Sequence, residues 1–220
     1  MSELNQLLFN FNHKQNFNYN DFYVSKSNFF AFKLIEEWPK WEKNILNIYG
    51  ESFSGKSHLS NIFLQKNKAL KLNNKDINSD IISKIKIHQN IIIDDLDDKI
   101  NEEILYSIIN TIDQDNKYLI LNSKICLNKI NFNLKDLSSR SKNFLFAKID
   151  KPDDELIFAL ILKNFSDRQV KIEKKIIDFI IKRIDRSYRK IHEFIYKIDQ
   201  LSLKKKKSID FNIIKEVLGE

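Results

Sequence analysis

The sequence predicts an α/β protein in which a five-stranded parallel sheet is followed by a helical lid. Three observations predict this fold class. Short apolar segments of strand length alternate with segments whose apolar residues recur at helical spacing. A loop of the form G-x4-G-K-S joins the first strand to the next helix. Beyond Pro152 only helical spacing remains, so the sheet domain is expected to span residues 20–150.

The elements of the sheet domain follow one another in regular alternation. The first helix is expected from Ser27 to Trp38, where Pro39 stops it. The five strands are expected at Ile45–Tyr49, Ala69–Leu72, Asn90–Asp94, Lys117–Leu121 and Phe144–Ile149. The helices between them are expected at Gly55–Lys66, Asp76–Ile87, Asn101–Asp115 and Leu134–Ser141. Strands that alternate with helices in this way are typical of a parallel sheet.

Two further regions flank the sheet domain. Residues 1–19 are polar and rich in asparagine, with one apolar island, and are expected to form a mobile arm. Residues 151–220 are expected to form a helical lid subdomain, with helices at Asp153–Phe165, Glu173–Ile184, Ser187–Leu201 and Asp210–Leu218.

The composition excludes several classes of protein. The 220 residues are 42% hydrophobic and 30% charged, which is typical of a folded domain. No apolar run is long enough to cross a bilayer, and the N-terminus lacks the features of a secretory signal. Cys126 is the only cysteine, which excludes a disulfide framework and a cysteine-built zinc site. These features favour a cytoplasmic protein with no membrane contact.

The net charge of +7 is mildly basic and is compatible with DNA or an acidic protein as partner. The most concentrated charge is the run Lys204–Lys207. Such a run also occurs as a solvated loop between two helices, and the sequence leaves both interpretations open.

The loop Gly50–Ser57 carries the most specific motif, a complete P-loop between a strand and a helix. Its backbone N–H groups form a concave anion site, and glycine permits close approach of a phosphate. Lys56 would reach the β- and γ-phosphates, and the Ser57 hydroxyl would coordinate Mg²⁺. We therefore expect ATP or ADP as ligand, bound by Gly50, Glu51, Ser52, Phe53, Ser54, Gly55, Lys56, Ser57 and His58. His58 and His88 have no metal-ligand spacing, so their rings are expected to serve packing.

Two later strands end in polar residues that suit the same site. Ile91-Ile92-Ile93 precedes Asp94 and Asp95, the pattern of an apolar strand that ends in a Mg²⁺-holding acid. Asp94 is the candidate for Mg²⁺, and Asp95 would polarise the attacking water. Asn122 ends the fourth strand and could orient that water, although asparagine is also common at strand ends.

Together these motifs resemble the AAA+ class, and within it the DnaA family with its shorter Hda-type regulators. The resemblance covers nearly the whole chain. It rests on Asp21–Val24 and Asn28 ahead of Trp38–Pro39, on Tyr49–Leu59, Ile93–Asp95 and Leu134–Arg140, and on Lys151–Glu155 and Ile184–Arg189 in the lid. No segment resembling the helix-turn-helix domain of DnaA follows the lid, so no sequence-specific DNA-binding domain is expected.

The resemblance implies roles for three arginines. Arg140 falls at the arginine-finger position, which reaches a neighbour's γ-phosphate in trans. Arg189 falls best at the sensor 2 position of the lid, with Arg186 as the second candidate. A surface ion pair is the alternative for each of them.

The resemblance also implies two protein partners. The stretch Gln6, Leu7, Leu8, Phe9 and Phe11 is similar to the clamp-binding peptide of Hda, which docks on the DNA polymerase sliding clamp. The alternative is that this stretch packs on the core of its own chain. The implied function is negative regulation of replication initiation by promoting hydrolysis of DnaA-bound ATP, with slow hydrolysis by the chain itself. A helicase loader that acts on single-stranded DNA is the second reading, and a homo-oligomer is left open.

Overall fold

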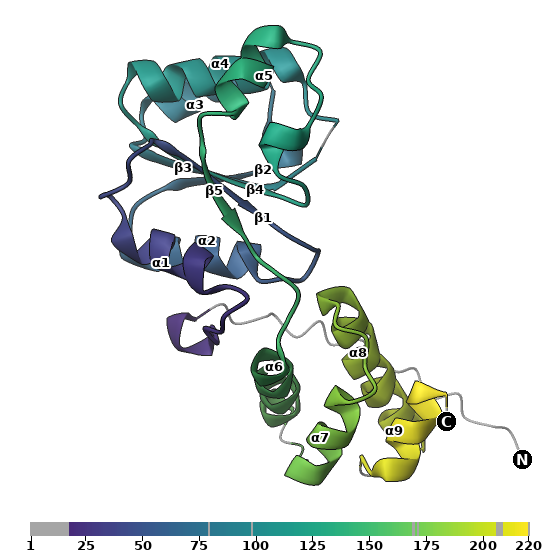
Figure 1. Ribbon diagram of the computed structural model, residues 1–220. Helices are drawn as coiled ribbons and strands as arrows, with labels where there is room; N and C mark the ends of the chain where they lie inside the picture. The colour runs from purple at the N-terminus through teal and green to yellow at the C-terminus, as the bar shows by residue number, and fades with distance from the viewer. Residues whose placement is uncertain are drawn as a thin grey trace, which may run out of the picture.

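The computed structural model describes residues 18–78, 80–97, 99–168, 170, 172–205 and 209–219. The predicted clamp-binding residues Gln6 to Phe11 lie outside this part of the chain. Five parallel strands form one sheet in the order β2-β3-β4-β1-β5 (Figure 1). The strands are β1 (Ile45–Tyr49), β2 (Leu70–Asn73), β3 (Asn90–Leu96), β4 (Tyr118–Ser123) and β5 (Leu145–Lys148). The predicted parallel sheet is therefore confirmed.

Helices cover both faces of the sheet (Figure 1). One face carries α1 (Phe29–Glu37) and α2 (Lys56–Lys66), and the other carries α3 (Ile81–Lys86), α4 (Glu102–Gln114) and α5 (Lys135–Ser141). Three consecutive isoleucines of β3 show how the two cores form. Ile91 and Ile93 pack beneath α3 and α4, whereas Ile92 packs beneath α2. Since both faces are covered, β3 is continuously apolar and not alternating.

Most predicted elements are confirmed to within a few residues, and α3 is the largest exception. It begins at Ile81 and not at Asp76, because residues Asn74–Asp76 form a 3-10 turn. In that turn the Asp76 carboxylate accepts a hydrogen bond from the Asn73 backbone N–H at 2.8 Å. This capping contact satisfies a local donor and replaces the first helical turn. Strand β3 also runs two residues past its predicted end.

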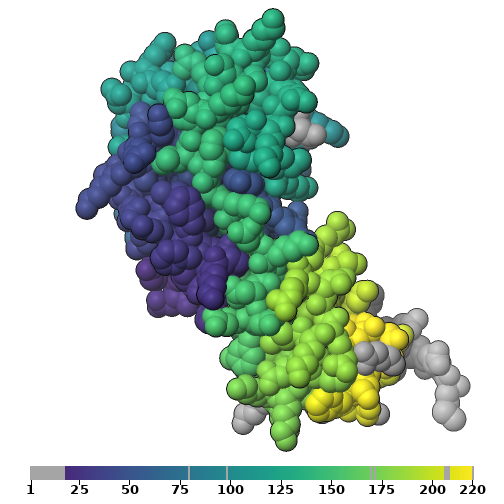
Figure 2. All heavy atoms as spheres, viewed as in Figure 1, coloured from purple at the N-terminus to yellow at the C-terminus, as the bar shows by residue number. Residues whose placement is uncertain are grey.

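The lid consists of α6 (Asp154–Asp167), α7 (Lys174–Ile181), α8 (Tyr188–Lys205) and α9 (Phe211–Leu218). It has its own core, made by buried side chains from all four helices, among them Ile161, Ile177, Ile195 and Ile214. Leu156 and Tyr188 instead join the core beneath α1 and α2, so the lid is anchored to the sheet domain. The lid extends from one end of the sheet domain, which gives the molecule an elongated shape (Figure 2).

Among the described residues, no helix is both long enough and apolar enough to traverse a bilayer.

Candidate nucleotide-binding site

The P-loop leaves β1 at a point where the backbone is crowded. The Gly50 N–H donates to the Ser123 carbonyl oxygen at 3.2 Å, and a Cβ at Gly50 would lie 2.9 Å from the Ile149 carbonyl oxygen. Gly55 has a φ of +96°, and a Cβ there would lie 3.2 Å from the ring of Phe22. The two P-loop glycines are therefore required by contact and by dihedral angle.

Lys56 is the first residue of α2 and is buried. Its ammonium group donates to the carbonyl oxygens of Gly50 and Glu51, each at 2.8 Å, and so lies across the mouth of the loop. Burial lowers the pKa of Lys56, and the nearby carboxylates of Asp95 and Asp94 oppose that shift. The arrangement holds a cation against the backbone of the P-loop.

The predicted Mg²⁺ residues lie together. The Ser57 hydroxyl donates to Asp94 Oδ1 at 3.0 Å, so the first turn of α2 and the end of β3 present their oxygens to each other. The described residues contain no cluster of three or more His, Cys, Asp or Glu side chains suited to hold a metal ion. One carboxylate and one hydroxyl fit Mg²⁺, because this ion usually keeps several water ligands and takes others from the phosphates of the nucleotide. Ser57 and Asp94 would hold such an ion.

The two residues with predicted catalytic roles differ in their surroundings. Asp95 is exposed, with a φ of +53°, at an irregularity in the pairing of β3 with β4. Such a bulge redirects a side chain and is common beside functional sites. Asn122 is fully buried, and its amide donates to Asp94 Oδ1 at 3.0 Å and to Ser60 Oγ at 2.7 Å. Asn122 therefore orients Asp94 directly.

The P-loop contacts the lid through Glu51 and Phe53, for which the sequence predicted nucleotide binding and no contact with the lid. The Glu51 carboxylate accepts hydrogen bonds from the Ser187 hydroxyl and, at 3.1 Å, from the Tyr188 N–H. The Phe53 ring, at a φ of +67°, stacks on the His192 ring with 4.3 Å between centroids. No local pattern identifies such contacts, because Glu51 and Ser187 are 136 residues apart.

Tyr188 also joins the lid to the segment that precedes α1. Its hydroxyl lies 3.3 Å from the Ser27 hydroxyl, and burial raises the pKa of Tyr188 to about 12. A phenol that remains protonated can hydrogen bond across the junction over the whole physiological pH range.

The predicted lid arginines are not brought to the P-loop. Arg189 pairs with Glu193 at 2.9 Å, one turn along α8. Arg186 pairs with Asp154 at 2.7 Å, at the start of α6. Both arginine side chains are more than half exposed, and the sensor 2 assignment stays a prediction. His58 packs edge-on against Phe22 and lies 2.8 Å from the Asn18 carbonyl oxygen, in keeping with a packing role.

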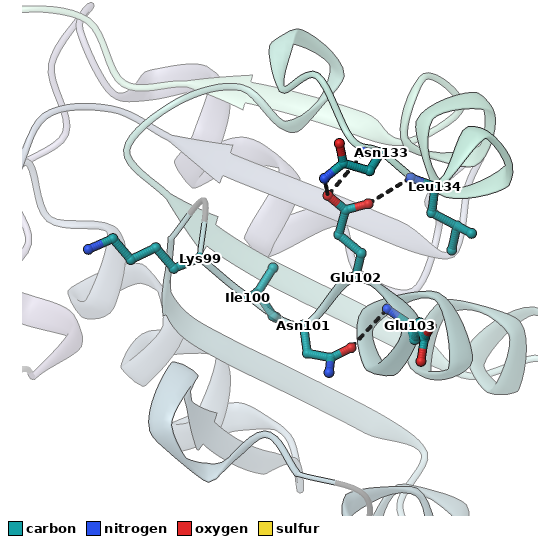
Figure 3. Close-up of a pocket in the computed structure, with 7 residues that line it drawn as sticks. All are labelled: Lys99, Ile100, Asn101, Glu102, Glu103, Asn133 and Leu134. Carbon is teal, nitrogen blue, oxygen red and sulfur yellow. Dashed lines mark hydrogen bonds between the residues drawn. The ribbon is translucent and has the colours of Figure 1, made fainter.

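Arg140 lies on α5, and its recorded partners belong to α4. It pairs with Asp113 at 2.6 Å and lies over the Tyr106 ring. The other end of α5 is also held by α4, because the Glu102 carboxylate accepts from the backbone N–H groups of Asn133 and Leu134 (Figure 3). These hydrogen bonds lower the pKa of Glu102. Helix α4 thus fixes the position from which Arg140 projects.

A cavity of about 730 Å³ lies beside the P-loop, and the residues that line it include Gly50, Glu51 and Tyr188. Four lysines line the same cavity, namely Lys124, Lys129, Lys148 and Lys151. Lys148 pairs with Asp150 at 2.5 Å. The charge of the cavity favours an anionic ligand.

Comparisons with known proteins agree with this architecture. Residues 153–218 match the family model of the Hda lid domain. The chromosomal replication initiator protein DnaA of Buchnera aphidicola subsp. Cinara cedri is 24% identical over 93% of this chain and 53% of its own length. The chain thus spans about half the length of the curated relatives it matches.

Two solved structures show the same fold. Domain III of the Thermotoga maritima replication initiation protein DnaA has a TM-score of 0.79 at 19% identity, covering 93% of this chain and 96% of that one. The replication initiator DnaA bound to AMPPCP and single-stranded DNA has a TM-score of 0.68 at 19% identity, covering 85% and 67%.

The parallel sheet, the P-loop and the helical lid together give the chain the AAA+ fold. Within that class, the lid match and the sequence relatives show that the chain is related to DnaA and Hda.

Proposed function

We propose that this chain binds ATP or ADP with Mg²⁺ and acts as an Hda-like regulator of chromosomal replication initiation. In this role it docks on the DNA polymerase sliding clamp and promotes hydrolysis of DnaA-bound ATP. The observation that carries the proposal is an intact P-loop joined to a lid that matches the Hda lid domain. The AMPPCP named for one structural neighbour supports a nucleotide as the ligand.

The chain's own groups support nucleotide binding. The N–H groups of the P-loop and the Lys56 ammonium would neutralise the phosphates, and Ser57 and Asp94 would hold Mg²⁺, which supplies further positive charge beside them. Asp95 is proposed to polarise the attacking water. Asn122 keeps Asp94 in position. Hydrolysis by the chain itself is proposed to be slow and secondary to regulation.

Arg140 is the proposed trans residue. Its contacts with Asp113 and Tyr106 hold it on the surface of the sheet domain, and 42% of its side chain is exposed. A guanidinium in that position is available to a γ-phosphate on a partner, where its planar fork can span two oxygens. In well-studied NTPases such a finger supplies several kcal/mol of transition-state stabilisation.

Two experiments test the proposal. Isothermal titration with ADP and ATP should show strong binding by wild type and a large loss for Lys56→Ala, because the substitution removes the cation beside the β-phosphate. A pull-down with purified sliding clamp should succeed with the full chain. It should fail for Gln6→Ala/Leu7→Ala if the arm docks on the clamp, and unchanged capture would refute that part of the proposal.

A second candidate function is action on single-stranded DNA, as in a helicase loader. The lysine-lined cavity beside the P-loop favours it, as does the single-stranded DNA named for one structural neighbour. Fluorescence anisotropy with single-stranded DNA at two salt concentrations discriminates between the two. Affinity that falls steeply with salt supports the loader, because phosphate contacts release counterions.

A further inference from the structure

The two oxygens of Asp94 are used very differently. Oδ1 accepts hydrogen bonds from Ser57 Oγ and Asn122 Nδ2, each at 3.0 Å, and from the Asp95 N–H at 3.2 Å. Oδ2 has one recorded partner, the ammonium of Lys71, at 3.2 Å. The carboxylate is buried, with 6% of its side chain exposed. The charge of the proposed Mg²⁺ ligand is therefore already balanced by a lysine.

Lys71 reaches Asp94 from the neighbouring edge strand β2. In the register of the two strands Asn73 lies opposite Asp94, and Lys71 lies opposite Ile92, two residues before Asp94. Its ammonium also donates to Asn61 Oδ1 of α2 at 3.2 Å, and 29% of its side chain is exposed. The Lys71 ammonium thus has a second acceptor besides the carboxylate, and its flexible side chain is partly open to solvent.

We propose that Lys71 is an internal counter-cation that competes with Mg²⁺ for Asp94 and so sets how strongly nucleotide binding depends on the metal. The inference rests on the proposed nucleotide site. It makes Lys71 a positioning residue that acts on the bound ion through Asp94. In the absence of Mg²⁺ the lysine keeps Asp94 neutralised, so that the carboxylate does not repel the phosphates.

The physical reason is the strength of charge interactions at a buried carboxylate. The Lys71 ammonium, 3.2 Å from Oδ2, pairs with a carboxylate in the interior, where an unpaired charge is costly. The same cation repels a divalent ion that approaches Asp94. Mg²⁺ must therefore displace the ammonium toward Asn61, and the metal adds less to the affinity for nucleotide than it would without Lys71.

The test compares ADP affinity in excess Mg²⁺ with ADP affinity in EDTA, by isothermal titration. For wild type, the ratio of the ADP affinity in Mg²⁺ to the ADP affinity in EDTA should be small. Lys71→Met removes the charge and keeps the length of the stem, and it should raise that ratio about tenfold by weakening ADP binding without metal and strengthening it with metal. Lys71→Arg retains a cation and should keep the wild-type ratio.

Lys68→Met is the matched control, because Lys68 is exposed and has no ion pair with a described residue. It removes one charge from the same region and should leave the ratio unchanged. A purely structural role for Lys71 would alter both affinities together and leave their ratio as in wild type, which would overturn the inference.

A second measurement needs no nucleotide. Mg²⁺ should raise the melting temperature of Lys71→Met more than that of wild type, since the metal then replaces the lost counter-cation. Equal metal responses would contradict the proposed competition. Failure of the proposed function is distinguishable, because a wild-type protein that binds no ADP in either condition refutes the nucleotide site itself.

Discussion

Gly55 is a residue whose backbone and surroundings both demand glycine. Its φ of +96° strains any other residue, and a Cβ would meet the Phe22 ring at 3.2 Å. Gly219 provides a matched control, since its φ is +82° and nothing lies within 4 Å of a Cβ placed there. Gly219→Ala should cost about 1 kcal/mol of unfolding free energy from the dihedral alone. Gly55→Ala should cost more in urea denaturation and should also weaken ADP binding. Equal costs would show that the Phe22 contact is unimportant.

We expect His58 to make the stability of the protein depend on pH. Burial lowers the pKa of His58 from its ordinary value of 6.5, so the folded state favours the neutral ring. The contribution of the neutral His58 ring to the free energy of unfolding is fully present above pH 6.5. It is lost as the pH falls through the lowered folded-state pKa, because the unfolded chain binds the proton more tightly. Melting temperatures measured from neutral to mildly acidic pH should decline less for His58→Gln than for wild type. Parallel declines would assign the acid sensitivity to other groups.

Some residues of the site could be predicted from local sequence motifs, whereas others could not. Gly50, Lys56 and Ser57 share one motif, and Asp94 follows an apolar run in β3, so their gathering at one place could be predicted from the sequence. Lys71 could not, because only the pairing of β2 with β3 brings it to Asp94. The roles of all these residues, and those of Asp95, Asn122 and the three arginines, stay predictions.

At the scale of elements, the first turn of α8 is held by the P-loop. The Glu51 carboxylate accepts from the Ser187 hydroxyl and the Tyr188 N–H, as an acidic cap at a helix N-terminus does. Glu51→Ala should cost about 1 kcal/mol of unfolding free energy and should speed hydrogen exchange at the start of α8. Glu193→Ala, which breaks only the exposed pairs with Arg189 and Lys190, should do neither.

Unchanged hydrogen exchange in the Glu51 variant would show that α8 keeps its position without the P-loop.

The boundaries of the elements, like the residues of the site, have some causes that are local in the sequence and others that are not. Strand β1 has the bounds that its apolar residues predict, whereas the start of α3 is shifted by the Asp76 capping contact. Apolar periodicity reports burial, and it does not report a polar contact that competes with a helical turn.

At the scale of the whole molecule, the lid is joined to the sheet domain at the proposed nucleotide site. Glu51 and Phe53 belong to the P-loop, and their partners Ser187, Tyr188 and His192 belong to α8 or precede it. A ligand that moves the P-loop therefore acts on the lid directly. Arg140 projects from α5, and its ion pair and ring contact within the described part of the chain are both with α4.

Because Arg140 lies apart from the chain's own P-loop, substituting it tests whether the chain acts in trans on a partner. Arg140→Ala should leave the chain's own ADP affinity and its clamp docking intact, yet abolish stimulation of ATP hydrolysis by DnaA in a reconstituted assay with clamp on DNA. Arg140→Lys should rescue little, because a point charge lacks the planar fork. Asp113→Ala is the decisive control, since it breaks the ion pair at 2.6 Å and keeps the guanidinium. If Arg140 served only that pair, both alanine variants would behave alike. If it acts on a partner's γ-phosphate, only Arg140→Ala should lose stimulation.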